Sequence, residues 1–241
     1  MTRIFHNAPL NVGTVITLND NAYNHVVRVL RMKIGDSFTL FNGNNHTFAA
    51  ELIQIDKKQA QVAVGETRFE NRESPLAIHL GQVISMGSKM DLTIQKSVEL
   101  GVQSITPLFA ARCGVKLDGE RLKKRVEQWQ NIVISACEQC GRNQIPVVNA
   151  AVKVGEWCAN LTNGLKLNLH PRAQQSINTL VLPTNQIHLL IGPEGGLSPD
   201  EISMATQHGF IDLLLGPRIL RTETAALCAI AALQTKFGDL G

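Results

Sequence analysis

The chain contains 241 residues, of which 44% are hydrophobic and 18% are charged, so it can bury a sizeable core in one large domain or in two smaller ones. Its formal net charge of +3 permits a nucleic-acid partner without requiring one. No apolar stretch is long enough to span a membrane, and the first residues lack the apolar core of a secretion signal. We therefore expect a cytoplasmic protein with no membrane partner.

Short strands separated by turns are predicted for the first part of the chain. Runs rich in apolar and β-branched residues alternate with clusters of Asn, Asp and Gly. The predicted strands cover residues 14–18, 37–41, 47–53 and 60–64. A single helix is predicted over residues 21–31, and the polar stretch 68–75 has the composition of a linker. This pattern favours a small β-barrel domain.

The part of the chain after the linker alternates strands with longer helices. We expect strands at residues 76–83 and 105–108, and helices at residues 90–100 and about 118–140. Strands that alternate with helices in this way usually form a mostly parallel sheet that is covered on both faces. The sequence therefore predicts a second domain of the α/β class.

The cysteines are predicted to be free thiols. The chain has five of them, and an odd number in a chain of this length does not suggest a disulfide framework. Cys137 and Cys140 form a CxxC pair, but no second pair completes the four ligands of a structural zinc site. We therefore expect no metal.

Two apolar runs near the C-terminus each end in a glycine-proline turn. The runs are His188–Ile191, before Gly192-Pro193, and Leu213–Leu215, before Gly216-Pro217. Turns at the carboxyl ends of parallel strands are where open α/β sheets bind ligands, and glycine lets a ligand approach the backbone closely. After the first turn, Ser198 or Asp200 can cap a helix that Glu201 helps to start. The chain has neither a GxGxxG motif opening a helix nor a GxxxxGK followed by Ser or Thr, so the common nucleotide-binding motifs are excluded.

At this point the sequence resembles a known family. The segments IGPEGG, LGPRILRTETAAL and, near the N-terminus, HVVRVLR closely resemble the RsmE family of ribosomal RNA methyltransferases. That family belongs to the SPOUT (α/β-knot) superfamily and uses S-adenosylmethionine as its methyl donor. The resemblance covers essentially the whole chain. It implies a PUA-like RNA-binding β-barrel domain over residues 1–71 and a methyltransferase domain over residues 72–241, threaded into a trefoil knot.

The resemblance also implies which residues surround S-adenosylmethionine. They belong to the two glycine turns and to a neighbouring strand end, namely Leu169, His170, Gly192, Glu194, Gly195, Gly196, Leu215, Gly216, Ile219, Leu220 and Thr222. Contacts of this kind depend on backbone shape more than on charged side chains. His170 could equally be a strand-end histidine that is hydrogen-bonded without a direct role. Methyl transfer needs no metal.

The residues after the second turn are the candidate catalytic groups. Thr222 is predicted as the N-cap of a helix that carries Glu223 in its first turn. A helix N-terminus flanked by Arg218 and Arg221 offers positive potential. Methylating uridine at N3 requires loss of the imide proton, and arginine donors to the uracil oxygens would stabilise the resulting anion. Glu223 could accept that proton if its pKa were raised, or it could orient an arginine.

A set of basic residues is the candidate RNA contact. Arg28 and Arg31 lie three positions apart on the predicted short helix, with His25 three positions before Arg28, so all three would share one face. Simple surface solvation is the ordinary alternative for each lysine or arginine. The candidate RNA-binding residues are Arg3, His25, Arg28, Arg31, Lys89 and Arg142.

The resemblance implies one function and leaves two alternatives open. We expect a homodimer that methylates N3 of a uridine in 16S ribosomal RNA, within the assembled small ribosomal subunit. The first alternative is a SPOUT enzyme acting on another RNA, such as transfer RNA. The second is a non-catalytic RNA-binding relative, although the intact glycine turns argue against the loss of activity.

Overall fold

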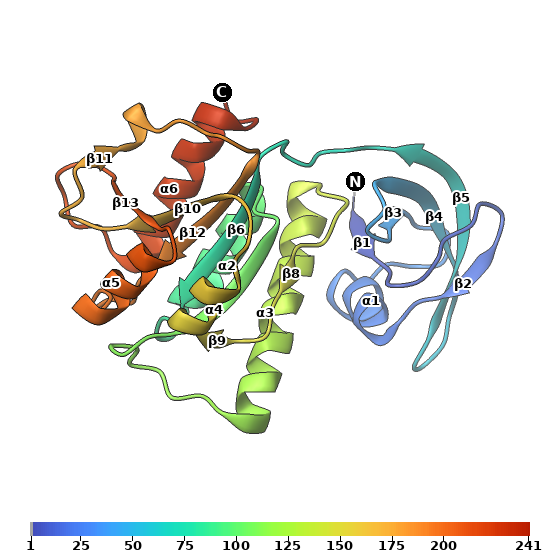
Figure 1. Ribbon diagram of the computed structural model, residues 1–241. Coiled ribbons are helices and arrows are strands. Elements are labelled where there is room, and N and C mark those ends of the chain that lie inside the picture. Colours follow the sequence, from blue (N-terminus) through green and yellow to red (C-terminus); the bar gives the residue numbers. More distant parts are fainter. Residues whose placement is uncertain (1) are drawn as a thin grey trace. The chain divides into compact units, whose positions relative to one another are not determined.

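The structure is a computed structural model that describes residues 2–241 (Figure 1). Contacts within the chain divide it into two compact units. The first contains the described residues up to Glu73 together with Cys137–Ile145, and the second contains Ser74–Ala136 and Pro146–Gly241. Among the described residues, no helix is both long enough and apolar enough to cross a membrane.

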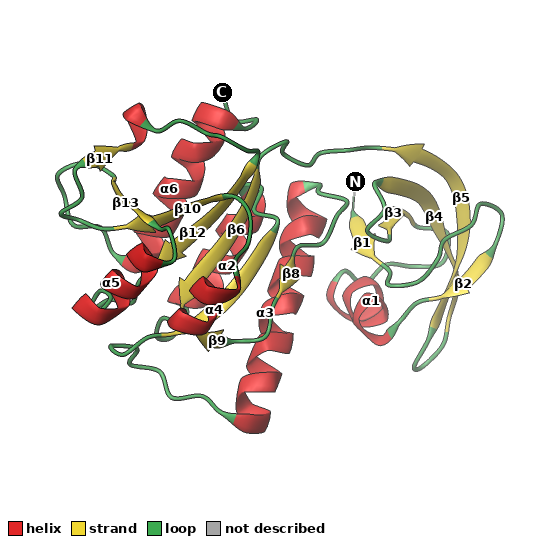
Figure 2. Cartoon of the chain, viewed as in Figure 1, coloured by secondary structure: helices red, strands yellow, loops and turns green. Residues whose placement is uncertain are grey.

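The first unit is built on a five-stranded sheet with the order β1-β3-β4-β5-β2 (Figure 2). Strands β3, β4 and β5 pair antiparallel, β1 runs parallel to β3, and β2 pairs antiparallel with β5. The strands are β1 (Arg3–Phe5), β2 (Val15–Thr17), β3 (Ser37–Phe41), β4 (His46–Ile55) and β5 (Ala60–Phe69). The strands predicted from sequence are all present, but β5 continues to Phe69, so the first residues of the predicted linker are strand.

Alternation along the strands builds the core of the first unit. Ala60, Val62 and Val64 of β5 are buried, while the residues between them are only half-buried. This period of two places one side of each strand in the core. Tyr23 and Val26, from the helical segment, belong to the same buried cluster.

The helical segment differs from the predicted single helix. It consists of the short helix α1 (Asp20–Tyr23) and a π-helical turn η1 (Asn24–Val29). The amide of Leu30 donates to the carbonyl of His25, five residues earlier, at 2.9 Å, which is the π-helical pattern. Arg31 follows the helix with φ of 54°, in the left-handed region. The prediction that Arg28 and Arg31 share one helical face is therefore wrong, although both side chains are exposed.

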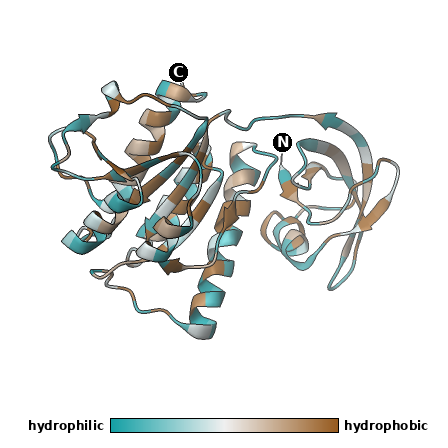
Figure 3. Cartoon of the chain, in the orientation of Figure 1, coloured by the Kyte–Doolittle hydropathy of each residue, from teal (hydrophilic) through white to brown (hydrophobic). Residues whose placement is uncertain are grey.

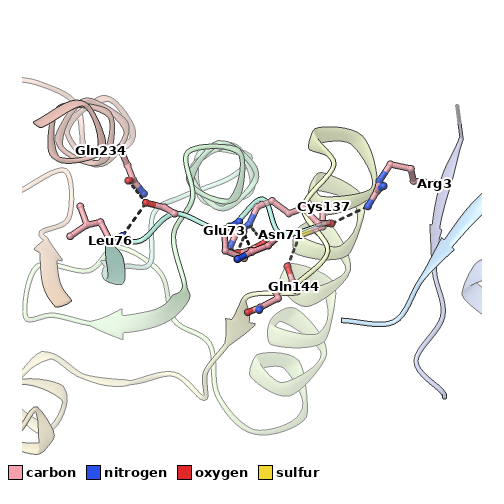
Figure 4. Close-up of polar contacts among 9 residues, drawn as sticks. Arg3, Asn71, Glu73, Leu76, Cys137, Gln144 and Gln234 are labelled. Carbon is pink, nitrogen blue, oxygen red and sulfur yellow. Dashed lines mark hydrogen bonds and ion pairs between the residues drawn. The ribbon is translucent and has the colours of Figure 1, made fainter. Parts of the chain in front are cut away.

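Residues 137–145, which begin in the last turn of helix α3 (Gly119–Cys140), complete the first unit (Figure 4). Arg142 is buried and ion-paired with Glu73, and its Nε donates to the Glu73 carboxylate at 3.0 Å. Glu138 accepts from the amide of Phe5 at 2.9 Å and pairs with His25 at 3.2 Å. Glu138 and Arg142, although close in sequence, therefore each pair with a side chain that is distant in sequence.

The same segment is tied to the first unit by an amide side chain. Asn143 is buried, and its Nδ2 donates to the carbonyl of Glu70 at 2.6 Å. Its Oδ1 accepts from the Arg3 guanidinium at 2.5 Å, and that guanidinium also lies 4.9 Å from the centre of the Phe41 ring. Cys137 donates to the carbonyl of Gln144 at 3.5 Å (Figure 4). Arg3 and Arg142 thus serve the packing of this unit.

The second unit is a parallel sheet with the strand order β11-β13-β10-β12-β6-β7-β8, and β9 also pairs with β7. Apolar residues make up much of its central strands (Figure 3). Its strands are β6 (Ala77–Val83), β7 (Ser104–Phe109), β8 (Val147–Val148), β9 (Val152–Lys153), β10 (Leu165–Leu169), β11 (Gln175–Ser176), β12 (Gln186–Ile191) and β13 (Ile211–Leu214). The predicted parallel sheet is confirmed.

Helices cover this sheet in two groups: α2 packs against α6, and α4 packs against α5. The helices are α2 (Lys89–Glu99), α4 (Val154–Asn160), α5 (Pro199–Gln207) and α6 (Thr222–Phe237), with a 3₁₀ turn η2 (Ile177–Thr179). Trp157 of α4 lies so close to β6 that a Cβ at Gly81 would stand 2.5 Å from its ring. Both tryptophans are buried, Trp129 at 1% exposure and Trp157 at 7%.

Two histidines stack between neighbouring strands of the second unit. The rings of His79 on β6 and His188 on β12 lie 5.1 Å apart with planes 24° from parallel. His79 Nδ1 lies 2.8 Å from the Ser104 hydroxyl, and His188 Nε2 lies 2.6 Å from the carbonyl of Asn163. Burial lowers the pKa of both rings, because the charged imidazolium loses its hydration there.

We expect this histidine pair to reduce the stability of the folded protein in mild acid. Because the folded state binds protons less readily than the unfolded chain, the free energy of unfolding should decrease as pH drops below about 6.5, by up to about 1 kcal/mol per pH unit for each ring. Substituting His79→Phe should reduce that slope, whereas His46→Phe, in the first unit, should not. Urea denaturation between pH 7.5 and 5.5 measures it, and parallel curves for wild type and His79→Phe would contradict the prediction.

Candidate functional site

A cavity of about 820 Å³ lies in the second unit where β10 and β12 end and α6 begins. A smaller cavity of about 90 Å³ adjoins it and reaches the end of β13. Every predicted cofactor residue lines one or both of them. Leu169, His170, Gly192, Glu194, Gly195, Gly196, Ile219, Leu220 and Thr222 line the larger cavity, and Leu215 and Gly216 line the smaller. The structure therefore brings together in space the residues that the sequence grouped by resemblance.

The first turn is shaped by tight packing and by a helix cap. A Cβ at Gly192 would stand 3.2 Å from Leu197 Cγ, so a larger residue would force Leu197 to move. After the turn, the Ser198 hydroxyl accepts from the amide of Glu201 at 3.2 Å, and the Glu201 carboxylate accepts from the amide of Ser198 at 2.8 Å. This capping box at the start of α5 confirms Ser198 as the predicted cap.

The second turn depends on a backbone conformation that favours glycine. Gly216 has φ of 80°, in the left-handed region, and nothing lies within 4 Å of the position where its Cβ would be. A side chain there would be limited by backbone strain and not by a clash. The turn leads through Pro217 to the exposed Arg218, Ile219 and Arg221.

Thr222 has a different role from the predicted N-cap. Arg221 occupies the N-cap position, and its side chain makes no capping hydrogen bond. The hydroxyl of Thr222 donates to the carbonyl of Gly192 at 2.7 Å and accepts from Gln82 Nε2 at 3.0 Å. Thr222 thus connects the start of α6 to the first glycine turn and to β6. Sequence reasoning missed Gln82, whose only signal is an amide side chain inside the apolar run of β6.

Four cationic side chains line the larger cavity, namely Lys89, Arg112, Arg172 and Arg221. Two of them contact the first glycine turn, where Lys89 pairs with Glu194 at 3.2 Å and Arg112 donates to the carbonyl of Gly195 at 3.0 Å. Burial opposes ionisation of Glu194, but backbone hydrogen bonds and Lys89 outweigh it and hold the pKa of that carboxyl below its ordinary value. Sequence reasoning did not place Arg112 or Arg172 at the site.

The three candidate catalytic residues are not equally placed. Arg221 is exposed and lines the larger cavity, and Arg218 is exposed and lines the smaller one. Glu223, in the first turn of α6, lines neither cavity. Its Oε2 is buried and has no hydrogen-bond partner among the described residues. The geometry therefore favours the arginines over Glu223 as groups that meet a substrate.

The candidate RNA-binding residues also differ in exposure. Of these candidates in the first unit, only Arg28 and Arg31 are exposed among the described residues, whereas His25 pairs with Glu138 and Arg3 binds Asn143. Arg28 lies 5.9 Å from the centre of the Tyr23 ring and donates to the carbonyl of Lys57 at 3.3 Å. Arg142 is only 5% exposed, so we withdraw it from the candidate RNA surface. Lys89 lies at the cavity of the second unit.

Thiols and other potential metal ligands are dispersed over the part of the chain that the structure describes. Among the described residues, no group of three or more His, Cys, Asp and Glu side chains could hold a metal ion. All five cysteines are free. Burial raises the pKa of the Cys137 thiol to about 12 and that of Cys158 to about 11, so both are protonated and unreactive near neutral pH.

Comparisons with known proteins agree with this arrangement. Residues 72–234 match the family described as RNA methyltransferase domain, and residues 18–65 match the family described as RNA methyltransferase PUA domain. The chain is 45% identical over 239 residues to ribosomal RNA small subunit methyltransferase E of Buchnera aphidicola subsp. Schizaphis graminum, which covers 99% of this chain and 97% of that protein.

Two solved structures are closely similar along the whole chain. One is ribosomal RNA small subunit methyltransferase E from Neisseria gonorrhoeae bound to S-adenosyl methionine, with a TM-score of 0.96, 42% identity and 100% of both chains covered. The other is a methyltransferase from Legionella pneumophila in complex with SAM, with a TM-score of 0.97, 46% identity and 99% of both chains covered. Together with the parallel sheet, they confirm the predicted fold class, a SPOUT (α/β-knot) domain preceded by a PUA-like domain.

We expect the Thr222 hydroxyl to stabilise the folded protein through its two hydrogen bonds. Thr222→Val keeps the shape of the side chain but leaves the Gly192 carbonyl and the Gln82 amide each short of a buried partner. We expect a loss of about 1–3 kcal/mol in the free energy of unfolding. Thr224→Val, at an exposed position in the same helical turn, is the matched control and should change stability little. Equal denaturation midpoints for the two variants would show that the Thr222 contacts contribute nothing.

Proposed function

This chain belongs to the RsmE family of small-subunit ribosomal RNA methyltransferases, and from that premise we propose that it transfers the methyl group of S-adenosylmethionine to N3 of a uridine in 16S ribosomal RNA. One observation carries the proposal. The two glycine turns are distant from each other in sequence. Their residues line the larger cavity and the smaller cavity that adjoins it, at the carboxyl ends of β10, β12 and β13. This is where a parallel sheet presents a ligand site.

The cavity suits S-adenosylmethionine in size and in chemistry. Its volume of about 820 Å³ lies within the range of sites for small molecules and cofactors. Apolar side chains of Leu169, Ile191, Leu197 and Leu220 line it beside backbone groups of the turns. The adenine ring and the methylene groups of the methionine chain suit such a surface, with a few hydrogen-bonding groups to fix orientation. Bound S-adenosylmethionine supplies the electrophilic methyl group.

The arginines beside the cavity suit the chemistry of an imide nitrogen. N3 of uridine holds its proton at neutral pH, so its attack on the methyl group is favoured by any group that stabilises the uracil anion. Arg221 lines the cavity at the N-terminus of α6, where the helix dipole adds positive potential. We assign the stabilising role to Arg221, with Arg218 nearby in sequence, and we assign Glu223 no contact with substrate.

Exposed cations supply the proposed contacts to RNA. Arg172 and Arg221 are exposed at the cavity, and Arg28 and Arg31 are exposed in the PUA-like unit. Such side chains bind phosphates and position an RNA without reading its sequence. The proposal also includes a homodimer acting on the assembled small subunit. Exposed apolar side chains in the second unit, among them Met86, Leu92 and Ile219, support a further protein contact.

The direct test is methylation in vitro. The protein is incubated with isotope-labelled S-adenosylmethionine and either naked 16S ribosomal RNA, assembled small subunits or transfer RNA, and the nucleosides are then identified by mass spectrometry. The proposal expects labelled N3-methyluridine from the assembled subunit. Label in transfer RNA alone would indicate a different RNA substrate. Binding of S-adenosylmethionine and RNA without any methyl transfer would instead indicate a non-catalytic relative.

The role of Arg221 makes a prediction about pH. Arg221→Ala should lower the single-turnover rate by about 100-fold near neutral pH, because the contact strengthens as negative charge develops on the base. The defect should shrink as pH rises, since N3 then loses its proton with less help. Arg121→Ala, at an exposed position that lines neither cavity, is the control and should react at the wild-type rate. A defect of constant size across pH would reduce Arg221 to a residue that positions the RNA.

The basic residues of the PUA-like unit should affect RNA and not the methyl donor. Reversing Arg28 and Arg31 to Glu should weaken RNA binding and flatten its dependence on salt, because fewer counterions are released per complex. The affinity for S-adenosylmethionine should stay as it was. Reversing Lys123 and Lys124, exposed on α3, gives the same change in net charge and is the control. If both double variants show the same salt slope, net charge alone explains the effect and the PUA-like unit is not the contact.

A further inference from the structure

Asn168 is a buried polar residue in the wall of the larger cavity. It lies on β10 between Leu190 of β12 and Asp212 of β13 in the register of the sheet. Its side chain is only 1% exposed, yet it is among the residues that line the cavity. A polar side chain in the middle of a parallel sheet needs partners for all of its hydrogen-bonding groups, because water does not reach it freely.

The orientation of the Asn168 amide is fixed by chemistry. Its Nδ2 donates to Asp212 Oδ1 at 2.7 Å. An ionised carboxylate can only accept hydrogen bonds, so the NH₂ group, and not the carbonyl oxygen, must face Asp212. This removes the usual ambiguity between the two ends of an asparagine side chain. The second oxygen of Asp212 lies 4.0 Å from His170 Nδ1, and the Asp212 side chain is 32% exposed.

The carbonyl oxygen of Asn168 therefore has no share in the contact with Asp212. Asn168 Oδ1 is buried and has no hydrogen-bond partner among the described residues. Donation from the same amide to a carboxylate polarises the group and makes that oxygen a stronger acceptor. An unpaired buried acceptor destabilises the protein unless something that binds nearby supplies a donor. The cavity that Asn168 lines is the place from which such a donor can come.

We infer that Asn168 Oδ1 accepts a hydrogen bond from an N–H or O–H group of bound S-adenosylmethionine, and that Asp212 positions the amide for this contact. The inference rests on the proposed function, because it takes S-adenosylmethionine as the occupant of the cavity. Three groups of that molecule can donate: the adenine amine, the ribose hydroxyls and the ammonium of the methionine part. The contact makes Asn168 a residue that selects the methyl donor by a hydrogen bond, within a cavity that otherwise binds through shape and backbone groups.

The first part of the test measures affinity. S-Adenosylhomocysteine, which keeps all three donor groups, is titrated calorimetrically into wild type and Asn168→Leu. The dissociation constant should rise by roughly tenfold in the variant, as for loss of one buried hydrogen bond. The melting temperature of the ligand-free variant should stay close to that of wild type, because the substitution also removes an unpaired buried acceptor. Asn149→Leu is the control, since Asn149 donates to Thr106 at 2.9 Å but lines neither cavity.

The second part identifies the donor group and separates contact from structure. Wild type and Asn168→Leu are compared with three analogues of S-adenosylhomocysteine, each lacking one of these donor groups: the 6-deamino (purine) analogue, the 2′,3′-dideoxy analogue and the analogue without the α-amino group. The inference expects one analogue to bind both proteins equally, because the group that Asn168 contacts is already missing from it. If Asn168→Leu weakens every ligand by the same factor, the residue has only a structural role and the inference is overturned. It is also overturned if S-adenosylhomocysteine binds the variant with wild-type affinity.

Asp212→Asn provides a second variant in case Asn168→Leu does not fold. A neutral amide at position 212 can present either end to Asn168, so the Asn168 amide is no longer held in one orientation. Binding of S-adenosylhomocysteine should weaken by about threefold, and the analogue that is insensitive to Asn168→Leu should again show no change. Unchanged binding of all ligands would overturn the positioning role. If wild type itself binds none of the ligands, the proposed function fails, which is distinct from failure of the Asn168 contact alone.

Discussion

The hydroxyl of Thr222 connects the elements on which the cavity depends. By donating to the Gly192 carbonyl and accepting from Gln82, it joins the turn after β12, the first residue of α6 and the interior of β6. These segments lie far apart in sequence. Gly192 and Thr222 line the cavity, whereas Gln82 of β6 holds the Thr222 hydroxyl without lining the cavity itself. Because all three groups are neutral and hydrogen-bonded, the contact avoids the desolvation cost of a buried ion pair. Together with the packing of α6 against α2, these two hydrogen bonds position the start of α6 and with it Arg221.

The second unit separates its charged groups from its apolar ones at the site. The strands contribute buried apolar residues. The first residue of α2, Lys89, and the loops at the carboxyl ends of the strands contribute the cations Lys89, Arg112, Arg172 and Arg221. An apolar wall below a rim of cations suits a ligand with an aromatic ring and a partner with phosphates. Lys89 and Arg112 are engaged with the first glycine turn, so they also fix the loop that they border. The same residues therefore serve the fold and the electrostatics of the site.

Local patterns in the sequence indicate most of the longer elements and the two glycine turns. The predicted strands, the long helices and the cap at Ser198 follow from short-range periodicity and from capping chemistry, and the structure confirms them, whereas β1, β8, β9, β11 and α4 were not predicted. The predictions are wrong where the structure depends on the exact type of helix or on a contact between residues distant in sequence. A π-helical turn cannot be distinguished from an α-helix by hydrophobic spacing, so Arg31 was placed on the wrong face. The partner of Arg142 is Glu73, and no local rule identifies a contact of that kind.

The residues that sequence reasoning missed share one property. Gln82 and Asn168 are amide side chains within apolar strands, and each is almost completely buried. A single polar residue in such a run is a weak signal by itself, since many are satisfied by neighbouring strands. Only the positions of Thr222 and Asp212 reveal what these amides do. Their roles depend on strand order, which the linear sequence does not display.

The first unit is discontinuous along the chain, and this has a consequence for its synthesis. Because translation starts at the N-terminus, the five strands have been synthesised well before Cys137–Ile145. Until then Glu73, the amide of Phe5 and the carbonyl of Glu70 lack the partners that Arg142, Glu138 and Asn143 provide. Domains often fold in order as they are synthesised. The first unit cannot complete its contacts from the residues up to Glu73 alone, because it also needs Cys137–Ile145. The unit therefore lacks these contacts until more than sixty further residues have been translated.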